Sequence, residues 1–382
     1  MRPHERAGAV DLDDFSAFDT IIDVRSPAEF ALDHLPGSVN HPVLDDAQRA
    51  EVGTLYKQVD PFAARRLGAA MVSANIANHL NSAFADRPKT WRPLVVCWRG
   101  GMRSGSMTTV LRAVGWDALQ LPGGYKRWRA HVVQKLNELP ARFRFCVVCG
   151  PTGSGKSRLL LALQAAGAQV LDLEVLAAHR GSVLGALPDQ PQPSQRLFEN
   201  HLHAALGKLD PARPVFVEAE SRRIGLLHVP EALMVAMRAS ACARIVANEM
   251  ARVELLLADY AHFLQSPEQL VDMLLRLREL HGNEQIAAWT DLVRQGRFAQ
   301  LVEALLRKHY DALYRRSSNG NYTHLGHALV LDGGALADDD FGRMAQALID
   351  NPPSLPAADK VNDNTATPVP APIDQAVLSA GA

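Results

Sequence analysis

Cysteine is scarce in this chain of 382 residues, and neither charge is in large excess. Cys97, Cys146, Cys149 and Cys242 do not show the paired spacing of a disulfide-stabilised secreted domain, so we expect a reducing compartment. The 40 lysines and arginines are balanced by 41 aspartates and glutamates. This balance excludes a positive field over the whole molecule, so any RNA binding must use a local patch.

Long apolar runs are also missing. The first 30 residues carry acidic side chains and no apolar stretch of signal-peptide length, and nowhere do ~18 uncharged apolar residues follow one another. These absences predict a soluble, cytoplasmic protein with no membrane segment. Single cores rarely grow beyond ~250 to 300 residues, so the length favours two domains.

Short apolar segments alternate with helical patterns along most of the chain, which is typical of the α/β fold class. In the first part, strands are predicted over residues 20–24 and 94–97, and helix over residues 47–85. In the second part, an apolar strand over residues 145–149 leads into a glycine-rich loop, whereas residues 230–315 are mostly helical in pattern. The core strands of the second part are therefore expected between residues 145 and about 250.

The domain boundary is predicted near residue 140, in a polar stretch between the two patterns. We predict a first α/β domain over residues 8–138, and a second domain with a phosphate-binding loop and a helical C-terminal part over residues 142–348. Residues 351–382 are rich in proline and poor in bulky apolar side chains, which predicts a disordered tail.

The first motif that could carry out a reaction is Cys97-Trp-Arg-Gly-Gly-Met-Arg103, which follows a predicted strand and runs into a predicted helix. Successive backbone N–H groups in such a turn, together with the helix dipole, lower the pKa of a thiol. Arg99 and Arg103 add positive charge, and Gly100 and Gly101 permit the dihedral angles of the turn. The motif predicts Cys97 as a catalytic thiolate supported by the two arginines; the alternative is an ordinary buried strand cysteine.

This loop and four other short motifs resemble the rhodanese family over residues 8–135. The other motifs are Asp23-Val-Arg25, Glu29-Phe30, Pro36-Gly37 and Gly123-Gly124-Tyr125. Rhodaneses carry sulfur or selenium on the loop cysteine, so the resemblance implies a rhodanese-like α/β domain in which Cys97 is the carrier. The loop residues implied to surround the carried group are Trp98, Gly100, Gly101, Met102 and Ser104.

The cysteine loop departs from the usual sulfurtransferase pattern by one residue. Five residues, Trp98 to Met102, separate Cys97 from Arg103, and this longer spacing resembles tyrosine-phosphatase-like enzymes. A wider loop can surround a tetrahedral, phosphate-sized group, which suits a phosphatase and equally suits a phosphorylated chalcogen donor such as selenophosphate. Phosphatases usually supply a general acid as well, and none is evident beside this loop.

The second motif, Gly150-Pro-Thr-Gly-Ser-Gly-Lys-Ser157, matches the Walker A pattern between an apolar strand and a helix. Its backbone N–H groups would cradle a diphosphate, Lys156 would reach the terminal phosphate, and Ser157 would ligate Mg²⁺ if a nucleotide were bound. No tightly bound cofactor and no firmer metal site is expected. The predicted diphosphate-binding residues are Gly150, Thr152, Gly153, Ser154, Gly155, Lys156 and Ser157.

Asp172 and Glu218 each end a predicted strand in the second part of the chain. We predict them as candidate acids for the phosphate loop; the alternative for each is an ordinary strand-end carboxylate. Cys146 and Cys149 should point to opposite faces of their strand and lie in the core, since no second cysteine pair completes a metal site.

A local basic and aromatic group is the candidate RNA-binding feature of this nearly neutral chain. Such side chains hold phosphates or stack on bases, although solvated charge and ordinary packing are the alternatives. The candidate tRNA contacts are Arg222, Arg223, Tyr314 and Arg315.

Over residues 15–315, further stretches resemble the tRNA 2-selenouridine synthase family, in which a rhodanese unit precedes a P-loop NTPase-like unit. They include Val52-Gly-Thr-Leu-Tyr-Lys57, Asp172-Leu-Glu174, His179-Arg-Gly-Ser182, Phe198-Glu199 and Glu220-Ser-Arg222. The resemblance implies that selenium replaces the 2-thio sulfur of a wobble uridine, 5-methylaminomethyl-2-thiouridine at tRNA position 34, through an S-geranyl intermediate.

The same resemblance implies tRNA as the partner and two cosubstrates, geranyl diphosphate and selenophosphate, the latter supplied by its synthase. The P-loop would then hold the departing diphosphate. Leu159, Leu160, Leu163 and the segment 183–184 are apolar candidates for the geranyl chain. Two other functions stay open: a Cys-dependent phosphatase or sulfurtransferase fused to a nucleotide-binding kinase-like module, and a non-catalytic binding protein.

Overall fold

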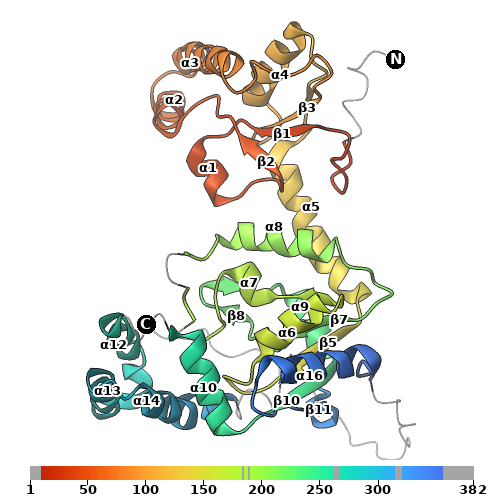
Figure 1. Ribbon diagram of the computed structural model, residues 1–382. Helices are drawn as coiled ribbons and strands as arrows, with labels where there is room; N and C mark the ends of the chain where they lie inside the picture. The colour runs from red at the N-terminus through yellow and green to blue at the C-terminus, as the bar shows by residue number, and fades with distance from the viewer. Residues whose placement is uncertain (1–9, 183–184, 188–189, 262–265, 315–320, 356–382) are drawn as a thin grey trace, which may run out of the picture.

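The computed structural model of the protein describes residues 10–182, 185–187, 190–261, 266–314 and 321–355 (Figure 1). Two α/β units follow one another along the chain, each with a parallel sheet. The predicted α/β fold class is therefore confirmed. None of the helices in these described ranges is both long and apolar enough to span a bilayer.

The sheet of the first unit has the strand order β2-β1-β3-β4. Its strands are β1 (Thr20–Asp23), β2 (Ser38–Asn40), β3 (Pro93–Val96) and β4 (Leu119–Gln120). The helices of this unit are α1 (Pro27–Leu32), α2 (Asp46–Gln58), α3 (Pro61–Asn81) and α4 (Met102–Val114). Parallel pairing places the carboxyl ends of β1 and β3 at one edge, where the cysteine loop begins.

The single helix expected over residues 47–85 is in fact two helices. Val59 has non-helical dihedral angles, and the Asp60 side chain accepts hydrogen bonds from the N–H groups of Phe62 and Ala63. Pro61 then occupies the first turn of α3, where its missing N–H costs nothing. A capped proline start therefore separates two helices, of which α2 buries no side chain and α3 buries side chains such as Val72 and Ile76.

The sheet of the second unit has the order β11-β10-β5-β7-β6, and every strand pair in it is parallel. Its strands are β5 (Phe145–Cys149), β6 (Gln169–Leu171), β7 (Val215–Glu218), β10 (Ala241–Val246) and β11 (Leu329–Asp332). Around it lie α6 (Lys156–Ala165), α7 (Leu173–Ala177), α8 (Gln195–Leu206), α9 (Glu231–Arg238) and α16 (Asp338–Asp350), with a small hairpin of β8 (Arg223–Ile224) and β9 (Leu227–His228). The phosphate loop leaves the central strand β5.

One strand of this sheet, β11, lies beyond the range of residues 145 to about 250 that was expected to hold the core strands. Strand β11 comes more than 80 residues after β10, from Val246 to Leu329, yet pairs directly with it. It is a short edge strand whose Leu329 and Val330 remain substantially exposed, so its local pattern carries little signal. The pairing depends on long-range contact with β10.

Between β10 and β11 lies a helical lobe formed by α10 (Glu249–Asp259), α12 (Pro267–Leu275), α13 (Arg278–Arg294), α14 (Phe298–Leu305) and the π-helical turn η3 (Leu306–Tyr310). Figure 1 shows α10, α12, α13 and α14 grouped to one side of the second sheet. The lobe has its own apolar core around the fully buried Trp289. A short turn, η4 (Leu325–His327), precedes β11.

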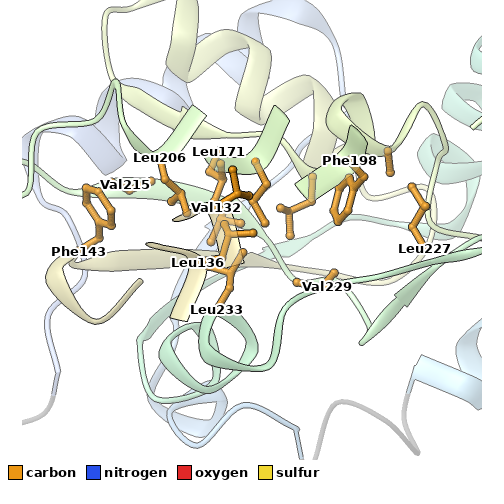
Figure 2. Packing of buried hydrophobic residues seen from close by; sticks show 14 of the residues in the cluster. Val132, Leu136, Phe143, Leu171, Phe198, Leu206, Val215, Leu227, Val229 and Leu233 are labelled. Carbon is orange, nitrogen blue, oxygen red and sulfur yellow. The ribbon is translucent and has the colours of Figure 1, made fainter. Parts of the chain in front are cut away.

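Helix α5 (Gly124–Glu138) joins the two units and packs on both. Figure 2 shows Val132 and Leu136 of this helix among Leu171, Phe198 and Val215 of the second unit. The polar stretch expected to separate the units is therefore mostly helical, and it continues into the 3₁₀ turn η2 (Leu139–Arg142). Apolar burial fixes the second unit against this helix.

A polar contact adds to this packing. Asn200 of α8 donates to the carboxylate of Asp33 and, at 2.8 Å, to the carbonyl oxygen of His34, and it accepts from the Trp128 indole N–H at 2.9 Å. Arg129 of α5 also pairs with Glu199 of α8. Asn200 is almost fully buried, so its bonds specify one docking arrangement of the units.

Candidate functional site

Cys97 lies directly after β3, at the carboxyl edge of the first sheet, and is 3% exposed. Its Sγ accepts hydrogen bonds from the Gly101 N–H at 3.3 Å and from the Ser104 hydroxyl at 3.0 Å. The Gln120 side-chain amide donates to the same Ser104 oxygen at 2.8 Å. The Ser104 hydroxyl can donate its own proton to the sulfur or to the carbonyl oxygen of Gly101, which lies 3.3 Å away.

The environment of Cys97 favours the thiolate. Burial by itself would raise the pKa of Cys97, but the Ser104 hydroxyl and the backbone N–H groups of Ser104, Gly101 and Arg99 lower it below its ordinary value. Among the other cysteines, burial raises the pKa of Cys146 well above the ordinary range, whereas a hydrogen bond with Cys149 lowers the pKa of Cys242. At Cys97 the lowering comes from groups of its own loop.

Two glycines make the cysteine loop sterically feasible. Gly100 has φ +66°, and a Cβ there would lie 2.6 Å from the carbonyl oxygen of Leu121. Gly124, with φ +56°, lies against the loop backbone, and a Cβ there would collide with the carbonyl oxygen of Cys97. The separate Gly123-Gly124 motif thus supports the cysteine loop by permitting close backbone approach.

The two arginines of the loop have different surroundings. Arg103 donates to the Glu29 carboxylate at 2.6 Å, so much of its charge is matched by that neighbour. Arg99 is exposed, and its backbone N–H is one of the groups that lower the pKa of Cys97. Among the remaining predicted loop residues, Met102 is largely exposed, and the Trp98 ring packs 5.2 Å from that of Tyr125.

A buried polar chain beneath the loop was not predicted. Arg25 bonds Asp23 at 2.6 Å, donates to the carbonyl oxygen of Asp33 at 2.6 Å, and stacks 4.0 Å above the Tyr125 ring. Tyr125 in turn donates to the Asp33 carboxylate at 2.6 Å, and that carboxylate also contacts Asn200 of the second unit. The motifs containing Asp23, Arg25 and Tyr125 were visible in the sequence, whereas nothing local marked Asp33 or Asn200.

The phosphate loop connects β5 to α6, with Gly150, Gly153 and Gly155 at positive φ. The Lys156 ammonium donates to the carbonyl oxygen of Gly150 at 3.0 Å, so it is folded over the loop. Ser154 is fully buried, whereas the other predicted diphosphate-binding residues line a cavity of about 1310 Å³. The structure thus brings the whole predicted set together.

Arg252 of the helical lobe braces this loop from α10. Its guanidinium donates to the carbonyl oxygen of Thr152 at 2.8 and 2.9 Å and pairs with Asp311 at 2.6 Å. Arg252 is 6% exposed, so these bonds lie out of water. An arginine inside an amphipathic helix gave no sequence signal of this role.

Four carboxyl groups gather beside Lys156 and Ser157. Besides the predicted Asp172 and Glu218, the structure adds two residues, Glu174 and Glu220, from stretches that carried the family resemblance. Burial is the main reason that the pKa of each of these four carboxyls is raised, and in Glu220, where the charge of Glu174 adds to it, the pKa reaches about 7.

Hydrogen bonds hold this acidic group in place. Ser157 donates its hydroxyl to Glu174 at 2.8 Å, and the Glu174 N–H donates to Glu218 at 2.9 Å. The second oxygen of Glu218 is buried without a partner among the described residues. These hydroxyl and carboxylate oxygens fit Mg²⁺, which would neutralise charge on a bound diphosphate.

Another group of ligand-type side chains lies at the junction of the units. Ligand atoms of Asp13, His131 and His203 fall within 4.8 Å of one another. Asp13 already accepts from His131 and from Lys135, each at 2.7 Å. The Asp13 carboxylate is thus already paired with side chains of the protein.

An apolar cavity of about 620 Å³ adjoins the phosphate-loop cavity. Thr152, Ser182, Leu256, Tyr260 and Tyr310 line both cavities, so they meet at these side chains.

The leucines predicted to hold an apolar chain lie elsewhere. Leu159, Leu160 and Leu163 are at most 1% exposed in the core between α6 and the sheet, so that expectation is wrong. Helix α6 turns these side chains inward, which leaves the helical lobe to supply the apolar wall. Segment 183–184 lies outside the described residues.

Each of the candidate tRNA contacts that the structure describes has different surroundings. Arg222 is exposed and pairs with Glu231, and the Arg223 side chain donates to the carbonyl oxygen of Gly225 at 2.7 Å. Tyr314 lines the phosphate-loop cavity, while Arg315 lies outside the described residues. RNA binding by these residues stays a prediction.

Fold and site together define a two-unit protein, with a thiolate loop on a rhodanese-like sheet and a phosphate loop on a second parallel sheet. Comparison with protein families agrees with this division. Residues 9–131 match the "Rhodanese-like domain", and residues 143–326 match the "tRNA 2-selenouridine synthase AAA domain".

Curated relatives match across both units. A tRNA 2-selenouridine synthase from Nitrosomonas europaea is 40% identical over 259 residues, which cover 66% of this chain and 67% of the relative. Proteins of the same name from Cupriavidus necator and Shewanella halifaxensis are 35% and 32% identical, and each comparison covers 77% of this chain and 87% of the relative. The chain belongs to the tRNA 2-selenouridine synthase family.

Proposed function

We propose that this protein replaces the 2-thio sulfur of a tRNA wobble uridine with selenium in two steps. Geranyl diphosphate first alkylates the sulfur of 5-methylaminomethyl-2-thiouridine at tRNA position 34, and selenium from selenophosphate then displaces the geranylated sulfur. Family membership supports the tRNA selenation. The two cosubstrates are proposed from the two loops.

The alkylation step is assigned to the phosphate loop. The thiocarbonyl sulfur forms a bond to C1 of the geranyl chain, while the C1–O bond breaks and diphosphate leaves with the electron pair. The loop and Lys156 line the cavity proposed for this leaving group, so the loop N–H groups and the Lys156 ammonium would stabilise the charge that develops on it. Alkylation also makes the sulfur a better leaving group for the second step.

The selenation step is assigned to the Cys97 loop. Attack of water on phosphorus of selenophosphate breaks the Se–P bond and yields phosphate and hydrogen selenide, without any oxidant. Hydrogen selenide then attacks C2 of the uridine and expels geranyl thiolate. The Gly101 N–H and the Ser104 hydroxyl make the loop a site for anionic groups, and Cys97 positions the selenium there without forming a bond to it.

One observation favours geranyl diphosphate over a nucleotide as the ligand of the phosphate loop: the two cavities meet. A nucleotide would present a polar sugar and base beyond its phosphates, whereas the cavity beside this phosphate loop is walled by leucine, valine and aromatic side chains. A diphosphate in the loop would therefore point an apolar chain into an apolar space.

Nucleoside mass spectrometry of tRNA from strains carrying single variants tests the two assignments. Cys97→Ser should lose selenouridine and accumulate S-geranyl-thiouridine, whereas Lys156→Ala should lose the geranylated nucleoside first. Unchanged selenouridine in the Cys97→Ser strain would refute the role of Cys97.

Ligand binding to the purified protein separates the two candidates for the phosphate loop. We expect geranyl diphosphate to bind more tightly than ATP, both with and without tRNA. Preference for ATP would favour a nucleotide-binding module. The Cys97 peptide should keep its unmodified mass after incubation with selenophosphate, because hydrogen selenide forms no bond to a thiol without an oxidant.

A further inference from the structure

The apolar cavity beside the phosphate loop has two ends of different character. Leu256, Tyr260 and Tyr310 also line the phosphate-loop cavity and therefore form its mouth. The residues that line the apolar cavity alone form its far end, and they come from α10, α12, α14 and η3: Leu257, Leu270, Phe298, Leu301, Val302, Leu305 and Leu306. The cavity thus runs from the phosphate loop into the helical lobe.

The far end is held in place by the core of the lobe. Leu270, Leu301 and Leu305 are at most 6% exposed and belong to the same apolar cluster as Trp289. Phe298 and Val302 are only partly buried, and they stand one helical turn apart on α14, which places them on one face. These two side chains can therefore change the size of the cavity without removing a fully buried core residue.

The mouth combines aromatic rings with positive charge. The Arg180 guanidinium lies 4.6 Å from the Tyr260 ring centroid and donates at 2.6 Å to the carbonyl oxygen of Asp259, and Arg180 also lines the phosphate-loop cavity. A ligand that crosses this mouth would have its anionic part beside Arg180 and Lys156, and its apolar part beyond Tyr260 and Tyr310.

We propose that the helical lobe sets the length of the isoprenoid chain that the protein accepts, with Phe298 and Val302 as the residues that limit it. This inference rests on the proposed use of an allylic diphosphate and adds the residues that select among such diphosphates. The walls of this cavity are leucine, valine and aromatic side chains for most of its extent, which suits an apolar ligand. Because each added methylene that fits or fails to fit an apolar pocket changes selectivity ~10-fold or more, a five-carbon unit is discriminated readily.

The experiment compares dimethylallyl, geranyl and farnesyl diphosphate as donors to 2-thiouridine-containing tRNA, with kcat/KM measured for each. The wild type should prefer the ten-carbon donor. Phe298→Ala enlarges the far end and should shift the farnesyl-to-geranyl ratio toward farnesyl by at least ~10-fold. Val302→Trp fills the cavity and should weaken geranyl diphosphate binding at least ~10-fold while inorganic diphosphate binding stays unchanged.

Leu275→Ala is the matched control, because Leu275 lies in the same lobe on α12 but is 38% exposed and does not line the cavity. It should keep the wild-type donor preference. Unchanged diphosphate binding in all three variants shows that the phosphate loop has kept its structure.

The outcomes separate this inference from the proposed function. Geranyl transfer by the wild type, with the same donor ratios in Phe298→Ala and Val302→Trp, would overturn the assignment of chain length to the lobe and leave the proposed function standing. No transfer of any of the three chains by the wild type would overturn the proposed geranylation itself, and the inference with it.

Discussion

Removal of the Ser104 hydroxyl tests the physical basis of thiolate activation. In Ser104→Ala, Cys97 would lose the 3.0 Å hydrogen bond that contributes most to lowering its pKa against burial. A hydrogen bond to a charged group contributes ~1.5 to 3 kcal/mol, and one pKa unit corresponds to ~1.4 kcal/mol. The pKa of Cys97 should therefore rise by about 1 to 2 units.

The assay is the rate of Cys97 alkylation by iodoacetamide as a function of pH, followed by mass spectrometry of the Cys97 peptide. Only the thiolate reacts, so the pH of half-maximal rate should move upward by the same 1 to 2 units, and the rate below that pH should fall ~10-fold or more. Peptides with Cys146, whose pKa burial raises, provide the slow internal reference.

Thr108→Val is the matched control for this variant. Thr108 lies one turn further along α4, and its hydroxyl donates to the carbonyl oxygen of Ser104 at 2.8 Å rather than to the sulfur. It should leave the Cys97 profile within ~0.3 unit of the wild type. An equally small shift in Ser104→Ala would refute the role given to the hydroxyl.

Three further predictions address stability. Burial and a neighbouring carboxylate raise the pKa of Glu220 from 4.5 to about 7, so the folded protein holds a proton that the unfolded chain releases, and stability is lost as the pH rises between these values. Glu220→Gln should therefore reduce the fall in melting temperature between pH 5 and pH 8. An unchanged fall would contradict this. Gly124→Ala should lower the free energy of urea unfolding by more than ~2 kcal/mol. Gly101→Ala is the control and should lower it by less than ~1 kcal/mol, because a Cβ at Gly101 would have no atom within 4 Å. Equal losses of unfolding free energy would exclude the backbone collision as the cause. Asn200→Leu should lower the free energy of urea unfolding by ~2 to 4 kcal/mol, because buried Asp33 loses a hydrogen-bond partner at the junction of the units. A loss below ~0.5 kcal/mol would show that this contact adds nothing to stability.

The two loops could be predicted because each is written in contiguous residues. Apolar β3 before Cys97 and apolar β5 before Gly150 are short buried strands, and the glycines that follow them stand where the backbone has positive φ. Strand, turn and helix start are local features, and they place N–H groups around an anion wherever the surrounding fold lies. The α/β class followed from the same alternation.

The elements that were missed depend on distant partners. Strand β11 is partly exposed and short, and only its pairing with β10 makes it a strand. Helix α5 follows the first unit in sequence, yet its Val132 and Leu136 complete the core of the second. Apolar periodicity shows that a face is buried but does not show against which element.

By itself, the sequence determined the α/β class and predicted Cys97 as a nucleophile and the loop from Gly150 to Ser157 as a diphosphate site. Only the tertiary structure decided which other side chains and cavities lie beside these loops. It brought Glu174 and Glu220 to Lys156, and it placed an apolar cavity from the helical lobe, more than 100 residues later in the chain, against the same loop. Local patterns encode backbone turns, whereas the burial of carboxylates and the walls of a cavity arise from packing between segments that are remote in sequence.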